Sequence, residues 1–165
     1  MIGDNVSARL LPVSGSMHLE RLSIDIRQLF HTDTDTDTDT DEEQEEESGF
    51  NNLSTLPALT HLAFSSQPNP EIVGNVLRSC PKIQILVIAF SASEAKTARR
   101  YAKFVENVDG RLVVATATYA DYSGDWEMGA RGGEDIWVRA EKFIAAKKRG
   151  DIEDRATVEG EDDDD

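Results

Sequence analysis

The sequence predicts an α/β fold in which a short parallel β-sheet is covered by helices. Three observations support this prediction. Apolar segments of one pattern, Leu-x-x-Leu-x-Leu with aliphatic or aromatic replacements, occur three times, helical patterns alternate with strand patterns, and the repeated segments keep a fixed spacing. Alternating strands and helices join through right-handed crossovers, which makes the strands parallel.

The repeated segments are LERLSI (19–24), LTHLAF (59–64) and IQILVI (83–88). The second and third begin 24 residues apart, whereas the first and second begin 40 apart, and subtracting the 16-residue run at 32–47 restores 24. A period of roughly 20–29 residues is that of leucine-rich repeats. We therefore expect a leucine-rich-repeat-like sheet with these segments as neighbouring strands in chain order. Helices would cover one face, as in a solenoid, or both, as in a doubly wound sheet, and the spacing favours the solenoid.

The first helix is expected at NPEIVGNVLRSCP (69–81). Asn69 can cap it, and Pro70 suits the first helical position, where a missing N–H costs nothing. Pro81 ends the helix because it cannot continue it. The run IQILVIAF (83–90) then predicts a strand buried on both faces. The apolar face of the helix comprises Ile72, Val73, Val76, Leu77 and Cys80.

A second helix is expected after Ser91, which forms a capping box with Glu94. It should extend to about Val108. The turn Asp109–Gly110 then leads into a further strand, RLVVATA (111–117). The buried face of this helix comprises Ala98, Tyr101, Ala102, Val105 and Val108.

The last helix has the clearest pattern. Glu134 and Asp135 are expected in its first turn and basic residues in its last turn, which suits the helix dipole at both ends. Gly150 is the expected C-cap. One stripe comprises Ile136, Trp137, Ala140, Phe143, Ile144 and Lys147, and the basic last turn comprises Lys147, Lys148 and Arg149.

The net charge of −15 is concentrated in two segments. Residues 32–47 hold ten acids and no base, and residues 151–165 hold nine acids and one base, which leaves 13 acids against 16 bases elsewhere. Such segments cannot bury apolar area and repel themselves. We expect one domain over 1–150, with a disordered acidic insertion at 32–48 and a disordered acidic tail at 151–165.

Composition excludes several classes of protein. Net acidity argues against nucleic-acid binding by the whole chain. No segment approaches the ~18 continuous apolar residues of a membrane span, and the N-terminus lacks the pattern of a secretory signal. The single cysteine, Cys80, excludes an intrachain disulfide and fits a reducing compartment. We expect a cytoplasmic or nuclear protein.

No motif for catalysis, a cofactor or a metal is found. His18, His31 and His61 lack the spacing of metal ligands. There is no G-x-S-x-G elbow, and the acidic run lacks the Gly and Glu positions of a calcium loop. We therefore expect no enzymatic activity, no cofactor and no metal site.

The stretch DWEMGARGGEDIWVRAEKF (125–143) allows two interpretations. Gly129, Gly132 and Gly133 precede a helix, where glycines can cradle an anion or simply turn the chain. The dinucleotide and P-loop patterns are not met, and the two acids at the helix start would repel a phosphate. A structural turn is favoured, and a small ligand- or anion-binding α/β domain is the alternative.

The tryptophans and Arg131 of this stretch lead to structural predictions. Trp137 lies on the apolar stripe and is expected in the core. Trp126 is expected to cap the exposed end of the repeat stack, since the last repeat of a solenoid needs cover. Arg131 is expected to pair with Asp125 or Glu127.

The segments LPALTHLAF, CPKIQILVIAF, RLVVA, DW and GARGGEDIWVRAEKFIA, followed by a basic and then acidic close, resemble the C-terminal part of leucine-rich-repeat, F-box-like proteins of mushroom-forming fungi. The resemblance covers roughly 17–150. In that family an N-terminal F-box would dock a ubiquitin-ligase adaptor, but no F-box is found here, so such an adaptor is not expected. Gln67 and Ser91 hold the positions of the usual repeat Asn, so the repeats are degenerate. One interpretation is a truncated member with an exposed first strand.

The outward positions of the expected sheet are the candidate partner-binding surface. They become more apolar toward the C-terminus, which suits an unknown protein partner or cover by the chain's own C-terminal segment. Both alternatives stay open. We expect a non-catalytic protein–protein interaction domain. The outward residues are Arg21, Ser23, Asp25, His61, Ala63, Ser65, Ile85 and Val87, with Ala89 completing the third strand.

Overall fold

The computed structural model describes residues 19–26, 53–116, 122–152 and 157–158. The acidic insertion expected at 32–48 lies outside these residues, as does most of the tail expected at 151–165. Thr157 and Val158 of the tail form a strand of the sheet, which differs from the disorder predicted there. For the residues outside the described ranges, the predictions of disorder stay predictions.

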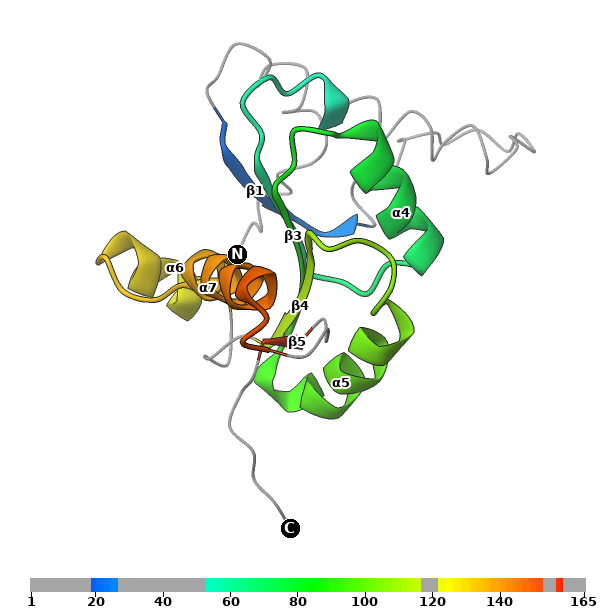
Figure 1. Ribbon diagram of the computed structural model, residues 1–165. Coiled ribbons are helices and arrows are strands. Elements are labelled where there is room, and N and C mark those ends of the chain that lie inside the picture. Colours follow the sequence, from blue (N-terminus) through cyan, green and yellow to red (C-terminus); the bar gives the residue numbers. More distant parts are fainter. Residues whose placement is uncertain (1–18, 27–52, 117–121, 153–156, 159–165) are drawn as a thin grey trace, which may run out of the picture.

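One parallel sheet forms the centre of the fold, and its strand order follows the chain (Figure 1). Each strand pairs in parallel with the next, so the predicted α/β class is confirmed. The three repeated segments are neighbours in the expected order. The strands are β1 (Arg21–Ile24), β2 (His61–Phe64), β3 (Ile85–Phe90), β4 (Leu112–Thr116) and β5 (Thr157–Val158).

The register of the sheet repeats the spacing of the sequence. Arg21 pairs with His61, and His61 pairs with Ile85, so equivalent positions of the three segments lie side by side. Side chains alternate between the two faces of a strand. An unchanged register therefore keeps each residue on the face that the pattern assigns to it.

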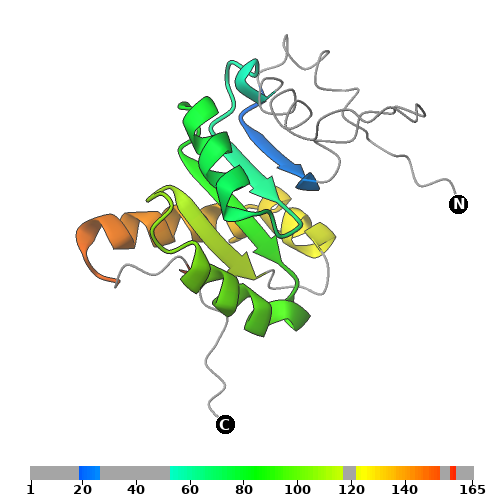
Figure 2. The same cartoon turned by 90° about the vertical axis from the view of Figure 1, so that its right-hand side faces the viewer.

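Helices cover both faces of the sheet, and this differs from the one-sided cover that the spacing favours. Figures 1 and 2 show α4 and α5 on one side of the strands and α7 on the other. The reason is the composition of β3 and β4, which are apolar on both faces and buried almost throughout. The helical segments are α4 (Pro70–Ser79), η2 (Ala92–Glu94), α5 (Ala95–Phe104), α6 (Tyr122–Ala130) and α7 (Ile136–Arg149).

The face of the sheet that α4 and α5 cover, called the first face, carries the larger core. Phe64, Leu86 and Ile88 are fully buried there, in contact with apolar residues of α4 and α5. Tyr101 of α5 is buried as well, and its hydroxyl donates to Pro68 O at 2.9 Å. The phenol thus keeps a hydrogen bond inside the core, as buried tyrosines usually do.

Most of the predicted helix ends are found. The Asn69 side chain accepts from Glu71 N at 3.1 Å, and the capping box of Ser91 and Glu94 is complete. The Ser91 hydroxyl that donates to Glu94 lowers the pKa of that exposed carboxyl. Gly150 caps α7 with a φ of 78°.

The second helix is shorter than predicted. It ends at Phe104 rather than near Val108, and Val108 N then donates to Val105 O in a tight turn. The Asp109 side chain accepts from Arg111 N, which favours a turn over further helix. Val108 consequently only flanks the core.

Arg111 joins three parts of the chain before it enters β4. Its guanidinium donates to Leu77 O near the end of α4, to Ile83 O before β3, and to both carboxylate oxygens of Asp109. Carbonyls at a helix end lack partners within the helix, and a guanidinium fork can satisfy several acceptors at once. The hydrogen bonds and the positive charge of Arg111 lower the pKa of Asp109, against the effect of burial.

We predict that Arg111→Met lowers the free energy of unfolding by about 2 kcal/mol at pH 7, because two carbonyls and Asp109 lose their donor. The Asp109 part is present above the ordinary pKa of an aspartate and is lost as the pH falls through the lowered value. Urea unfolding at neutral and acid pH measures both. The matched control is Arg78→Met, since Arg78 is exposed on α4. Equal losses for the two variants would contradict the prediction.

Candidate functional site

The opposite face of the sheet, on which α7 packs, is called the second face. It carries the positions that the sequence predicts to point outward. The register places Arg21, His61 and Ile85 in one row across the strands. The next row on the same face is Ser23, Ala63 and Val87. The structure therefore brings these positions together as predicted, but it gives the two halves of the face different surroundings.

The apolar half of this face is interior. Ala63, Ile85 and Val87 are 2%, 5% and 0% exposed, and they pack beneath Phe143 and Ile144 of α7. Of the two alternatives for the apolar strip, the structure has the chain's own C-terminal segment as the cover. These three residues are thus not on the surface, which corrects their place among the candidate binding residues. Val113 and Ala115 of β4 complete the buried face and were not in the predicted surface.

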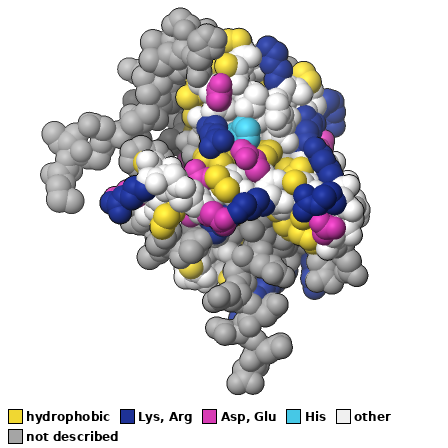
Figure 3. Space-filling model, turned by 60° about the vertical axis from the view of Figure 1, so that its left-hand side comes forward, with side chains coloured by type: hydrophobic (Ala, Val, Ile, Leu, Met, Phe, Trp, Pro, Cys, Tyr) yellow, Lys and Arg dark blue, Asp and Glu magenta, His cyan; other side chains and the backbone are white. Residues whose placement is uncertain are grey.

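The polar half of the face contains a cluster around Glu141 of α7. Glu141 Oε1 lies 3.1 Å from Arg21 Nη2 and 3.2 Å from His61 Nε2. The His61 ring meets the Trp137 ring edge-on, with centroids 5.7 Å apart. Figure 3 shows basic, acidic and histidine side chains together on one side of the molecule. Arg21 and His61 are therefore both in contact with a residue of α7. The sequence pattern did not predict this contact between the helix and the first two strands.

The remaining predicted residues lie toward the other end of the strands. Asp25 follows β1, and its carboxylate accepts from the Ser66 hydroxyl at 2.8 Å. The same hydroxyl accepts from Ile26 N at 3.2 Å. Ser65 is half-buried and donates its N–H to Ile24 O at 3.2 Å, whereas Ser23 is exposed between the two ends. Asp25 and Ser65 thus tie β1 to the segment after β2.

His61 is held in its neutral form near pH 7. Burial lowers its pKa most, the Arg21 charge lowers it further, and Glu141 acts in the opposite direction. With its proton on Nε2, the ring donates to Glu141, and Nδ1 can accept from the Thr60 hydroxyl at 2.8 Å.

The Thr60 hydroxyl, the imidazole and Glu141 form a hydroxyl–imidazole–carboxylate series, which in hydrolases activates a nucleophile. Here Thr60 Oγ1 also lies 3.3 Å from Glu20 O, and Thr60 N donates to the same carbonyl. The single hydroxyl proton goes either to His61 Nδ1 or to Glu20 O. The backbone hydrogen bond from Thr60 N fastens the start of β2 to the chain before β1. Thr60 therefore has a structural role at the start of β2.

The N-terminus of α7 is occupied by carboxylates of the chain itself. Asp125 of α6 is 3% exposed, and its Oδ2 accepts from Ile136 N at 2.6 Å. Its Oδ1 accepts from Arg139 Nη2 at 2.9 Å. Asp135, as the N-cap, accepts from Val138 N at 2.8 Å. Negative charge at this end complements the helix dipole, so Asp125 and Asp135 take the place that a bound anion would need.

The glycines of this stretch allow α6 and α7 to approach each other. A Cβ on Gly129 would clash with the Asp135 side chain, and one on Gly133 would clash with Met128. Gly132 has a φ of 79°, in the left-handed region that favours glycine. The structural-turn interpretation fits this geometry, with one correction: Gly129 lies within α6, so the turn itself is shorter than the 129–133 segment.

Sequence reasoning missed α6 and the partner of Asp125. The pattern of α6 is weak because small and polar residues interrupt any apolar stripe. Arg131 pairs with Glu127 at 3.6 Å, both exposed, as one of the two predicted alternatives had it. Asp125 instead pairs with Arg139, fourteen residues away. The side chain of Trp126, predicted to cap the stack, lies outside the described side chains.

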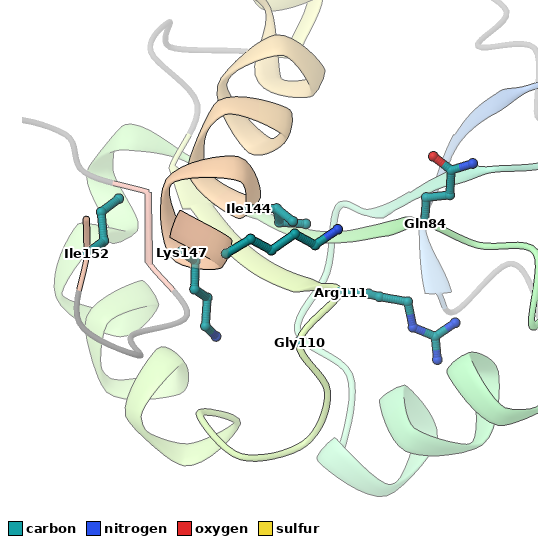
Figure 4. Close-up of a pocket in the computed structure, with 7 residues that line it drawn as sticks. Gln84, Gly110, Arg111, Ile144, Lys147 and Ile152 are labelled. Atoms are coloured by element: carbon teal, nitrogen blue, oxygen red, sulfur yellow. The ribbon is translucent and has the colours of Figure 1, made fainter. Parts of the chain in front are cut away.

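A surface pocket of about 590 Å³ lies between α7 and the loops that enter β3 and β4 (Figure 4). Gln84, Gly110, Arg111 and Lys147 are among its lining residues. Figure 4 shows the Arg111 guanidinium turned away from α7, where it serves Leu77 O and Asp109. The Arg111 guanidinium is thus already hydrogen-bonded within the chain.

The part of the chain that the structure describes has no group of three or more His, Cys, Asp or Glu side chains that could hold a metal ion. Among the described helices, none has the length and apolar character to cross a bilayer. Cys80 is buried, and burial raises the pKa of its thiol, so it is not a reactive thiolate.

No family model, curated protein or solved structure matches this chain. The resemblance to fungal leucine-rich-repeat proteins therefore stays a prediction.

We predict that Asp125→Ala destabilises the protein by about 3–5 kcal/mol, because it leaves Arg139, whose side chain is 17% exposed, without its carboxylate. Thermal or urea unfolding measures the loss. Glu127→Ala is the matched control, because it removes an exposed acid of the same helix, two positions after Asp125. Its free energy of unfolding should fall by no more than about 1 kcal/mol. A loss no larger than that of the control would refute the anchoring role of Asp125.

Proposed function

We propose that this chain is a non-catalytic protein–protein interaction domain of the leucine-rich-repeat type, and that it binds its partner with the polar half of the second sheet face. One observation carries the proposal. The helix α7 packs on β3 and β4. Within the described part of the chain, Glu141 of α7 and Arg21 and Ser23 of β1 are exposed. In repeat proteins, side chains on successive strands or helices together form the binding surface.

The residue types of this surface support a polypeptide partner. Arginine and tryptophan are enriched where protein–protein interfaces gain most of their free energy. Trp137 meets the His61 ring edge-on, and Glu141 joins His61 to Arg21. Arg21 and Glu141 retain 44% and 43% exposure of their side chains, so both have contact area left to offer. A partner that brings a carboxylate to Arg21 and a donor to Glu141 would match this pattern.

A ubiquitin-ligase adaptor is not part of the proposal, and neither is anion binding at the glycine turn. The first would need an F-box, for which no residues were identified. The second would need free N–H groups at the start of α7, and Ile136 N and Val138 N already donate to Asp125 and Asp135.

We predict that proteins captured by the intact chain include at least one whose capture falls about tenfold or more with Arg21→Glu. Quantitative mass spectrometry of parallel affinity captures measures this. Arg78→Glu is the control, because it makes the same charge change on the exposed side of α4. The double variant Arg21→Glu/Glu141→Lys restores the internal ion pair with reversed sign. It should fold normally and still fail to capture the partner.

A different pattern of capture would contradict the proposal. Partners lost equally with Arg21→Glu and Arg78→Glu respond to overall charge and not to this face. If every captured protein behaves in this way, the polar half of the sheet face is not the binding surface.

A further inference from the structure

The outer side of α5 carries a row of cations. Lys96, Arg99, Arg100 and Lys103 follow one another at positions i, i+3, i+4 and i+7, and all four are exposed. Residues at these spacings lie on one side of a helix. The opposite side carries Ala98, Tyr101 and Ala102, which are buried against the sheet. We call the four residues the cationic stripe.

The cationic stripe has no anionic partner within the described part of the chain. The ion pairs found there involve Arg21, Arg111, Arg131, Arg139, Lys142 and Arg149, and none belongs to α5. Like charges three and four positions apart on a helix are destabilising. Four cations therefore stand together on one side of a ten-residue helix. An acidic ligand would relieve this repulsion.

The chain itself contains such a ligand. Residues 159–165 read EGEDDDD, six acids without a base. Seven residues reach about 23 Å when extended, and a helix of ten residues, such as α5, is about 15 Å long. The segment is therefore long enough to meet every member of the cationic stripe.

The position of β5 directs this segment toward α5. Thr157 and Val158 pair with Val114 and Ala115 of β4, and β5 contacts α5. Because β5 is parallel to β4, it points toward the edge of the sheet where β3 ends and the η2–α5 segment begins. At this edge Glu134 and the N-cap Asp135 lie before α7 rather than in its first turn, as the sequence had predicted, and both repel acids. The basic end of α7 lies at the opposite edge.

We propose that the acidic C-terminal segment 159–165 binds across the cationic stripe of α5 as an intramolecular ligand. A tether of a few residues gives effective concentrations in the millimolar range, so weak ion pairs are sufficient. The bound segment competes with any external polyanion for α5. This contact is on the first face of the molecule and does not depend on the proposed partner surface.

Zero-length carbodiimide cross-linking of the intact chain at low concentration, followed by peptide mass spectrometry, tests the proposal. We expect links from Lys96 or Lys103 to acids of 159–165 within one chain. They should fall several-fold in 0.5 M salt, because exposed ion pairs are screened. They should also fall in Arg99→Gln/Arg100→Gln, which keeps both lysines. Arg131→Gln/Arg149→Gln removes the same charge elsewhere and should leave the links unchanged.

Other linkage patterns would overturn the proposal. Links from the α5 lysines to 32–47 would assign the cationic stripe to the acidic run of the first repeat. Links between two chains would assign it to a second copy, and links of 159–165 to Lys147 or Lys148 would place the segment at the end of α7.

A second measurement avoids dependence on cross-linking yield. In the full-length variant in which Asp162, Asp163, Asp164 and Asp165 are all replaced by Asn, amide NMR signals of 95–104 should shift relative to the intact chain. Signals of β1 and β2 serve as the internal control. Unchanged α5 signals would contradict the proposal.

Discussion

The structure depends on one constraint: β3 and β4 are apolar on both faces, so both faces must be covered. Strands of this composition cannot leave one side to water, as the strands of a one-sided solenoid do. Helices α4 and α5 cover the first face, and α7 covers Val87 and Ala89 on the second. The same constraint limits the candidate binding surface, because only Arg21, Ser23 and His61 of β1 and β2 are polar on the face where β3 and β4 carry apolar residues.

The position of α7 is fixed by charge as well as by packing. Asp125 is nearly inaccessible, and it is compensated by Arg139 and by Ile136 N. Burying a pair of charges costs desolvation, which is recovered only when geometry and further hydrogen bonds are good. The pair therefore contributes chiefly to placing α7. The consequence reaches the surface, because α7 also supplies Glu141 and Trp137 to the cluster around His61.

Much of the fold followed from local sequence patterns. Equal spacing after removal of one acidic run predicted the register of Arg21, His61 and Ile85, because a repeat fixes which residues face the same way. Asn69, Ser91 and Gly150 marked helix ends through chemistry that acts over a few residues. The pairing of Asp125 with Arg139 could not be predicted in this way. It depends on a turn between two helices, one of which has no clear apolar stripe.

The sequence predicted which residues form the candidate site, but not which of them α7 would cover. The register shows that Arg21, His61 and Ile85 share one face, as the pattern predicted. Nothing local shows that α7 lies over Ile85 and leaves Arg21 exposed. Glu141 belongs to the polar side of a helix whose register against the sheet is set by Phe143 and Ile144.

The most direct test of two-sided cover compares Ala140→Glu with Ala145→Glu in α7. Ala140 is 0% exposed against the sheet, whereas Ala145 faces solvent on the same helix. Urea unfolding should show a loss of at least about 3 kcal/mol for Ala140→Glu, which buries an unpaired charge. The loss for Ala145→Glu should be within about 0.5 kcal/mol. Equal stability of the two variants would mean that α7 does not cover the second face.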